Sequence, residues 1–135
     1  MKYWILKSEP DVYSYDDLVK QGKGTWDGVR NYTARNNLKE MKVGDKAFFY
    51  HSNIGKEIVG VISIAKEAYQ DPTTEDQRWV AVEVVPEKKL KKSVSLQQIK
   101  EDPAINHIDL VRLSRLSVIA LTKADFDYLL KLAQE

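Results

Sequence analysis

The sequence contains no cysteine. This absence excludes disulfides, zinc sites with cysteine ligands, iron–sulfur clusters and thiol nucleophiles, and it fits a cytoplasmic location, where disulfides are rare. Long apolar runs are also missing, since no stretch approaches the roughly 20 residues that a membrane helix needs. The opening segment, Met1 to Pro10, is too short and polar for a signal peptide. We therefore expect a cytoplasmic protein without a membrane segment.

Residue types for catalysis and metal binding do not cluster in the sequence. His51 and His107 are its only histidines and lack ligand-like spacing, so we expect no metal site and no cofactor. Ser8, Asp27 and His51 could form a triad on paper, but no nucleophile-elbow motif surrounds Ser8. Glycine-rich phosphate loops are absent as well. An enzyme that uses His51 as acid or base is kept as an alternative, because the pKa of histidine lies near neutrality.

A strongly basic charge is missing too. Lys and Arg number 21 against 20 for Asp and Glu, which gives a net charge of +1 and a pI near 7.8. Proteins that coat nucleic acid are much more basic, so any nucleic-acid binding must depend on a local site. The length of 135 residues suits a single domain, 1–135. The sequence leaves the oligomeric state open.

Apolar and β-branched runs predict strands separated by turns and short helices. The expected strands cover residues 3–8, 46–52, 57–65, 78–85 and 118–121. Capping residues indicate helix starts at Ser14, Asn31, Ser95 and Thr122. Because strands and helices do not alternate regularly, we expect an α+β domain around a curved sheet or barrel.

The stretch from Gly24 to Leu38 has the most unusual chemistry. On a helix capped by Asn31, a buried stripe is predicted at Ala34, Leu38 and Met41. A second row is aromatic, cationic and amide-bearing: Tyr32, Arg35, Asn36 and Lys39. Its first two turns hold no acidic residue, and Trp26 and Arg30 precede it. Flat rings, amides and guanidinium groups are suited to nucleotide recognition.

Trp26 differs from the other two tryptophans. Trp4 and Trp79 fall in apolar strands and are expected in the core, whereas Trp26 is flanked by Gly24, Thr25, Asp27 and Gly28. A partly exposed tryptophan beside flexible turns can stack on a base. On physical grounds, a tryptophan that plugs the end of a barrel is nearly as well supported.

Together these segments resemble the EVE domain family, small proteins of the PUA-like superfamily that are related to YTH RNA-binding domains. The resemblance rests on matching blocks in family order at Tyr3–Pro10, Trp26–Tyr32, Ala34–Asn36, Met41–Asp45, Phe48–Ser52, Ile58–Val61 and Ser114–Val118. It implies a PUA-like mixed β-barrel of about five or six strands with short surrounding helices. It also implies a pocket for a flipped, modified nucleobase.

Site residues follow from the resemblance, position by position. The implied base pocket consists of Lys7, Ser8, Trp26, Asn31, Phe49, Tyr50, His51 and Ser52. The implied phosphate or base-edge contacts are Arg30, Arg35, Arg115 and Ser117.

Our leading hypothesis is a non-enzymatic domain that binds nucleic acid and accommodates a modified base. The alternatives are an enzyme acting on a nucleobase or nucleotide through His51, and a protein-interaction domain that uses the basic segment Lys88–Lys92. DNA and RNA are equally compatible with the sequence, as are several base modifications.

Overall fold

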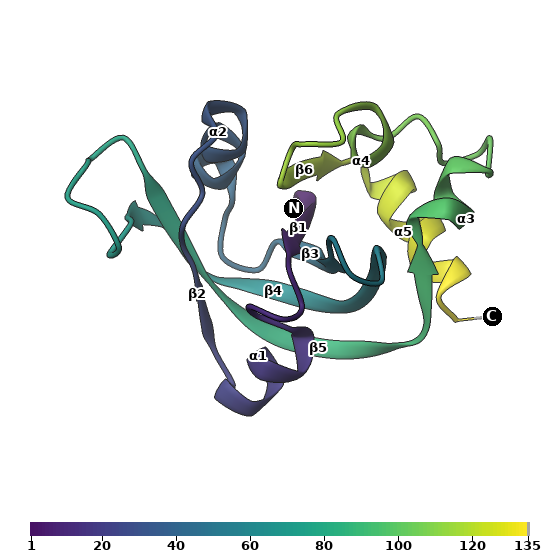
Figure 1. The fold of residues 1–135 in the computed structure, drawn as a ribbon, viewed down its shortest axis with the longest axis horizontal. Helices are drawn as coiled ribbons and strands as arrows, with labels where there is room; N and C mark the ends of the chain where they lie inside the picture. Colours follow the sequence, from purple (N-terminus) through teal and green to yellow (C-terminus); the bar gives the residue numbers. More distant parts are fainter. Residues whose placement is uncertain (135) are drawn as a thin grey trace.

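The computed structural model describes residues 1–134, which form one six-stranded sheet with five short helices around it (Figure 1). The strands are β1 (Tyr3–Ser8), β2 (Gly24–Trp26), β3 (Lys46–His51), β4 (Glu57–Gln70), β5 (Val80–Ser95) and β6 (Val118–Leu121). Their order in the sheet is β2-β5-β4-β3-β1-β6. Strands β1 and β3 run parallel, and every other neighbouring pair is antiparallel. The predicted α+β class and strand number are confirmed.

The sheet is strongly curved but not closed by hydrogen bonds between its edge strands in the described part of the chain. Strands β4 and β5 are the longest, and their pairing shifts register at several points, which bends and twists a sheet. Figure 1 shows these two strands sweeping through the whole molecule. Helix α2 (Tyr32–Glu40) packs against β4, β5 and β6, and so covers the opening between the two edges.

Local capping explains where most helices begin. The side chains of Ser14, Asn31, Ser95 and Thr122 each accept a backbone N–H in the first turn of the helix that follows. These helices are α1 (Tyr15–Gln21), α2, α3 (Leu96–Lys100) and α5 (Lys123–Leu132). Helix α4 (Asp109–Arg112) has no such cap. None of the helices formed by residues 1–134 is long and apolar enough to cross a membrane.

The core lies inside the curved sheet. Trp4, Ile5 and Leu6 of β1 are all buried, as both faces of a central strand should be. Helix α5 closes one end, where the ring of Phe126 stacks on Phe48 at 4.4 Å. The two ends of the sheet therefore differ, because α1, α2 and the turns around β2 surround the opposite end.

Three sequence-based expectations need correction. Residues 24–26 form the edge strand β2, paired with Val82–Val84, where we expected only a turn. Strand β5 begins at Val80 and continues through the basic segment to Ser95, because Lys88, Lys89 and Val94 pair with residues of β4. Trp79 lies outside the strands and is only half-buried, with its ring against Tyr32 at 5.2 Å.

Candidate nucleic-acid-binding site

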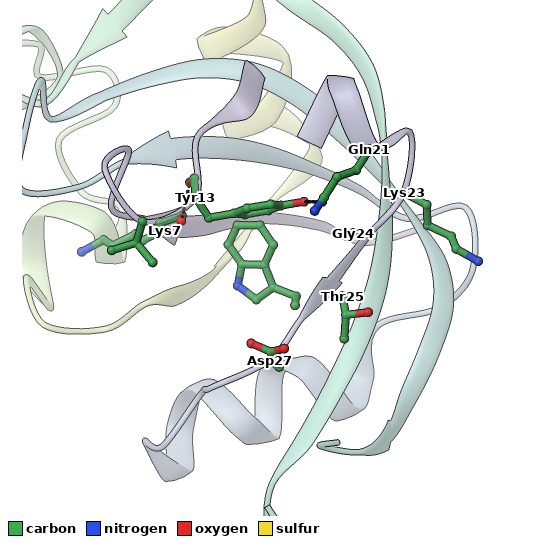
Figure 2. Close-up of a pocket in the computed structure, with 10 residues that line it drawn as sticks. Lys7, Tyr13, Gln21, Lys23, Gly24, Thr25 and Asp27 are labelled. Carbon is green, nitrogen blue, oxygen red and sulfur yellow. Dashed lines mark hydrogen bonds between the residues drawn. The ribbon is translucent and has the colours of Figure 1, made fainter. Parts of the chain in front are cut away.

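A cavity of about 490 Å³ opens where β1 ends beside β2. Its walls come from the end of β1, the turn that follows it, the end of α1 and the whole of β2. The lining residues are Lys7, Ser8, Val12, Tyr13, Gln21, Lys23, Gly24, Thr25, Trp26 and Asp27. Figure 2 shows Tyr13 on one side of the cavity and Asp27 on the other. Of the residues predicted for the base pocket, Lys7, Ser8 and Trp26 lie here.

Trp26 is both a core residue and a cavity wall. Only 6% of its surface is exposed, and its ring meets Phe49 edge-to-face at 5.2 Å and 85°. This contact fixes the indole in one orientation. The two interpretations of Trp26, as a pocket wall and as a core plug, therefore describe the same side chain.

Tyr13 supplies a second ring that the sequence did not suggest. Its ring lies edge-on to Trp26 at 6.2 Å and 71°. Its hydroxyl donates to Gln21 Oε1 at 2.6 Å, and its carbonyl accepts the Ser8 hydroxyl at 2.7 Å. Any side chain at Gly24 would overlap with the Tyr13 hydroxyl, so this glycine makes room for the ring. One feature of the sequence could have indicated its role: Tyr13 is an aromatic residue between the Pro10 turn and the helix cap Ser14.

The rim of the cavity carries charges of both signs. Lys7 Nζ donates to the carbonyl of Ser114 at 3.0 Å, and burial lowers the pKa of Lys7. Lys23 pairs with Glu83 at 3.2 Å. Burial, together with the nearby charge of Asp71, raises the pKa of Asp27 despite the opposing effect of Arg30. Asp27 is itself exposed at the rim, so its carboxyl group is accessible to a bound ligand.

The predicted strand end from Phe49 to Ser52 lies behind the cavity and supports it without lining it. Phe49 is fully buried beneath Trp26, and the ring of buried Tyr50 faces Lys7 Nζ at 5.7 Å. The backbone N–H of Ser52 donates to the carbonyl of Ser8 at 2.9 Å. These contacts hold the end of β1 in place.

His51 also has a supporting position. Its Nε2 accepts the backbone N–H of Tyr15 at 3.1 Å, and burial lowers the pKa of its ring. A neutral imidazole that caps α1 in this way does not face the cavity. Among residues 1–134, no group of three or more His, Cys, Asp or Glu side chains could hold a metal ion.

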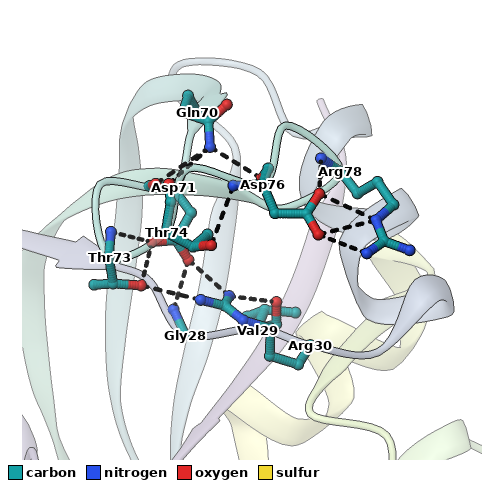
Figure 3. A network of polar contacts seen from close by, with 9 residues as sticks. All are labelled: Gly28, Val29, Arg30, Gln70, Asp71, Thr73, Thr74, Asp76 and Arg78. Atoms are coloured by element: carbon teal, nitrogen blue, oxygen red, sulfur yellow. Dashed lines mark hydrogen bonds and ion pairs between the residues drawn. The ribbon is translucent and has the colours of Figure 1, made fainter.

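Arg30 is held by a buried carboxylate rather than left free at the surface (Figure 3). Asp71, fully buried, accepts Arg30 Nη1 at 3.0 Å and the backbone N–H of Gly28 at 2.8 Å. It also accepts the backbone N–H and hydroxyl of Thr73 at 2.7 and 2.6 Å. Burial alone would raise the pKa of Asp71, but these hydrogen bonds outweigh it and lower the pKa to about 2. The network fixes the turn directly after Asp27.

Arg35 belongs to a neighbouring cluster of rings and guanidinium groups. Its guanidinium lies 5.0 Å from the ring of Tyr32, which is 52% exposed, and donates to the Asn36 side chain. Arg30 and Arg78 lie 5.7 and 5.9 Å from the ring of Trp79. We call these residues, Arg30, Tyr32, Arg35, Arg78 and Trp79, the arginine–aromatic cluster.

The remaining predicted residues, Asn31, Arg115 and Ser117, do not line the first cavity. Asn31 and Arg115 line a second cavity of about 350 Å³, together with Thr33, Leu113, Ser114 and Leu116. Ser117 uses its carbonyl to accept the backbone N–H of Lys7 at 3.0 Å. The predicted residues are thus divided between two cavities, the strand end behind the first cavity, and the neighbouring surface.

Comparison with known proteins places this geometry in a family. The sequence profile of the EVE domain matches residues 2–132. Thymocyte nuclear protein 1 of Mus musculus is 37% identical over 98% of this chain and 74% of its own length. The corresponding protein of Homo sapiens is 35% identical, again over 98% of this chain and 74% of its own length.

Solved structures agree. The crystal structure of protein Atu2648 from Agrobacterium tumefaciens has a TM-score of 0.96 at 36% identity, over 98% of this chain and 93% of that chain. Human THYN1 in complex with DNA containing 5-methylcytosine has a TM-score of 0.92 at 33% identity, over 100% of this chain and 99% of that chain. A Zygosaccharomyces rouxii YTH domain shares the fold at 17% identity and a TM-score of 0.61, over 99% of this chain and 87% of that chain. The chain therefore belongs to the EVE domain family.

Proposed function

We propose that this protein binds nucleic acid and holds one flipped, modified base in the cavity that Trp26 and Tyr13 line. The observation that carries the proposal is the pair of rings at the wall of a preformed cavity. Its volume of about 490 Å³ lies within the range of roughly 300–1,000 Å³ that is usual for small-ligand sites. A base extruded from its stack would regain stacking contacts there.

Similarity to human THYN1 supports the ligand class. That protein, which was crystallised with DNA containing 5-methylcytosine, aligns with the whole of this chain. The alignment includes the segments that build the cavity, so the same kind of ligand is the simplest expectation. DNA is thus the first nucleic acid to test as a ligand, and RNA is the second.

Asp27 is suited to select the base. A carboxylate accepts hydrogen bonds from an exocyclic amino group, such as N4–H₂ of cytosine, but not from the O4 of thymine. Asp27 lies at the cavity with its pKa raised by burial. We infer that bases with an amino group on their pairing edge are preferred.

The supporting residues take different parts in this proposal. Ser8 holds Tyr13, while Phe49, Tyr50, His51 and Ser52 fix the wall and the end of β1. Arg30 and Arg35 would meet flanking phosphates from the arginine–aromatic cluster. Catalysis through His51 is not favoured, because its Nε2 is used by Tyr15. The cytoplasmic location and the single-domain organisation are kept as predictions.

Titration of oligonucleotides tests the proposal. Matched DNA and RNA strands, with and without 5-methylcytosine, are titrated at one fixed salt concentration. We expect tighter binding of a modified strand and at least a tenfold loss in Tyr13→Leu, since stacking contributes about 1–3 kcal/mol per base. Tyr3→Leu is the matched control, because Tyr3 is a half-buried tyrosine at the other end of β1 that packs on Phe126. Equal binding of modified and unmodified strands would contradict the proposal.

A further inference from the structure

The second cavity has a composition that suits a nucleotide. Its walls are the start of α2, with Asn31 and Thr33, and the segment 113–116. Leu113 is 48% exposed and provides an apolar surface, while Leu116 is buried. No carboxylate is among the lining residues. An apolar wall beside amide, hydroxyl and guanidinium donors can hold a base or sugar together with its phosphate.

Arg115 is the strongest anion-binding group in this cavity. Its side chain is exposed, and none of the hydrogen bonds or ion pairs found within residues 1–134 uses its guanidinium. Two arginines of the arginine–aromatic cluster differ, because Arg30 and Arg78 are paired with Asp71 and Asp76. A guanidinium without a carboxylate partner can bind phosphate through two parallel hydrogen bonds.

Lys7 connects the two cavities. It lines the first cavity, and its ammonium donates to the carbonyl of Ser114, which lines the second. An ammonium group has three N–H donors, so two remain for another acceptor. A phosphate that joins a nucleotide in the first cavity to one in the second would pass this group.

We propose that the second cavity holds the nucleotide next to the flipped base, with the intervening phosphate between Lys7 and Arg115 and the neighbouring base against Leu113. This inference rests on the proposed function of the first cavity and extends it. The protein then contacts a two-nucleotide unit, and its preference includes the neighbour of the modified base.

Coupled changes in protein and ligand test the phosphate contact. The ligand is a single-stranded 9-mer with 5-methylcytosine at its centre, and each adjacent phosphate is replaced in turn by a neutral methylphosphonate. We expect one replacement to weaken binding about tenfold, because it removes the charge that strengthens the hydrogen bonds to Arg115 and Lys7. In Arg115→Gln, where only Lys7 remains beside the phosphate, the same replacement should weaken binding clearly less than tenfold. The matched control is Arg112→Gln, because Arg112 is an exposed arginine at the end of α4 that does not line the cavity.

A second pair of coupled changes tests whether the neighbouring base contacts Leu113. An abasic nucleotide on the sensitive side should weaken binding to the native protein severalfold but leave the affinity of Leu113→Ser nearly unchanged. Independent, additive losses in either cycle would overturn the inference. Failure of the proposed function would give a different result. Tyr13→Leu would then leave the affinity unchanged, and modified and unmodified strands would bind equally, regardless of the effect of Arg115→Gln.

Discussion

Asp71 shows how one buried side chain can fix a binding surface. Its carboxylate accepts hydrogen bonds from Gly28, Arg30 and Thr73, and these join the turn after Asp27 to the 71–79 loop. Gly28 and Arg30 lie 43 and 41 positions away from Asp71 in the sequence. Sequence patterns could suggest a polar loop here but could not pair these residues, because the pairing depends on the curvature of β4 and β5.

Replacing Asp71 by Asn should destabilise the protein by about 2–3 kcal/mol, because the amide leaves Arg30 without its counter-charge and places donors opposite donors. Urea denaturation measures the loss. Asp76→Asn is the control, since Asp76 pairs with Arg78 at the surface, and its effect should be clearly smaller. Equal effects of the two substitutions would contradict the role given to Asp71.

The pH dependence of the same pair gives an independent check. Because the folded-state pKa of Asp71 is lowered to about 2 from 3.8, its contribution to stability is fully present above the unfolded-state pKa and disappears as the pH falls towards 2. The stability difference between the native protein and Asp71→Asn should therefore be largest above about pH 5 and shrink in acid. A constant difference would contradict this assignment.

Asp27 determines specificity in our account. In Asp27→Asn the new amide can also donate to the O4 of thymine, so the preference for 5-methylcytosine over thymine should fall roughly tenfold, equivalent to about 1.4 kcal/mol. Competition between two strands that differ only at this base measures the ratio. Glu75→Gln, in an exposed loop position, should leave it unchanged. An unaltered ratio in Asp27→Asn would remove this residue from base selection.

At the scale of elements, local signals predicted more than long-range ones. Cap residues located the starts of α1, α2, α3 and α5, and apolar and β-branched runs located β1, β3 and β6. The edge strand β2 was missed because a segment of three residues that begins with a glycine and is flanked by turns carries little β signal. Tyr13 was missed for a related reason, since only the tertiary fold brings its turn beside Trp26. Sequence patterns therefore predicted the Trp26 wall of the cavity but not its second ring.

The position of α1 relative to the sheet depends on Gly60. A Cβ atom at this position of β4 would overlap with the ring of Tyr15, whose hydroxyl donates to the carbonyl of Val61 at 3.1 Å. We expect Gly60→Ala to destabilise the protein by about 2–3 kcal/mol through overpacking and to weaken base binding by moving Tyr13.

A double-mutant cycle separates this clash from a general loss of strand stability. Adding Tyr15→Leu should recover part of the loss in Gly60→Ala, because a smaller side chain leaves room for the new methyl group. Strictly additive denaturation energies would show that Tyr15 is not the group in conflict.

For the whole molecule, the near-neutral charge limits how binding energy can arise. A net charge of +1 provides little general attraction, so affinity must come from a few contacts and from the base itself. With about three phosphate contacts to a single strand, affinity should fall roughly 20-fold between 50 and 200 mM salt. Fluorescence anisotropy across this range measures the slope. A much steeper slope would indicate extensive backbone binding instead of recognition at one site.

The central claim is that the modified base enters the cavity that Trp26 and Tyr13 line. The most direct test is NMR on the complex with a strand carrying a ¹³C-labelled methyl group on 5-methylcytosine. The account predicts an upfield-shifted methyl signal with NOEs to ring protons of both Trp26 and Tyr13. A complex that forms with equal affinity while its methyl group shows NOEs to neither ring would contradict the account.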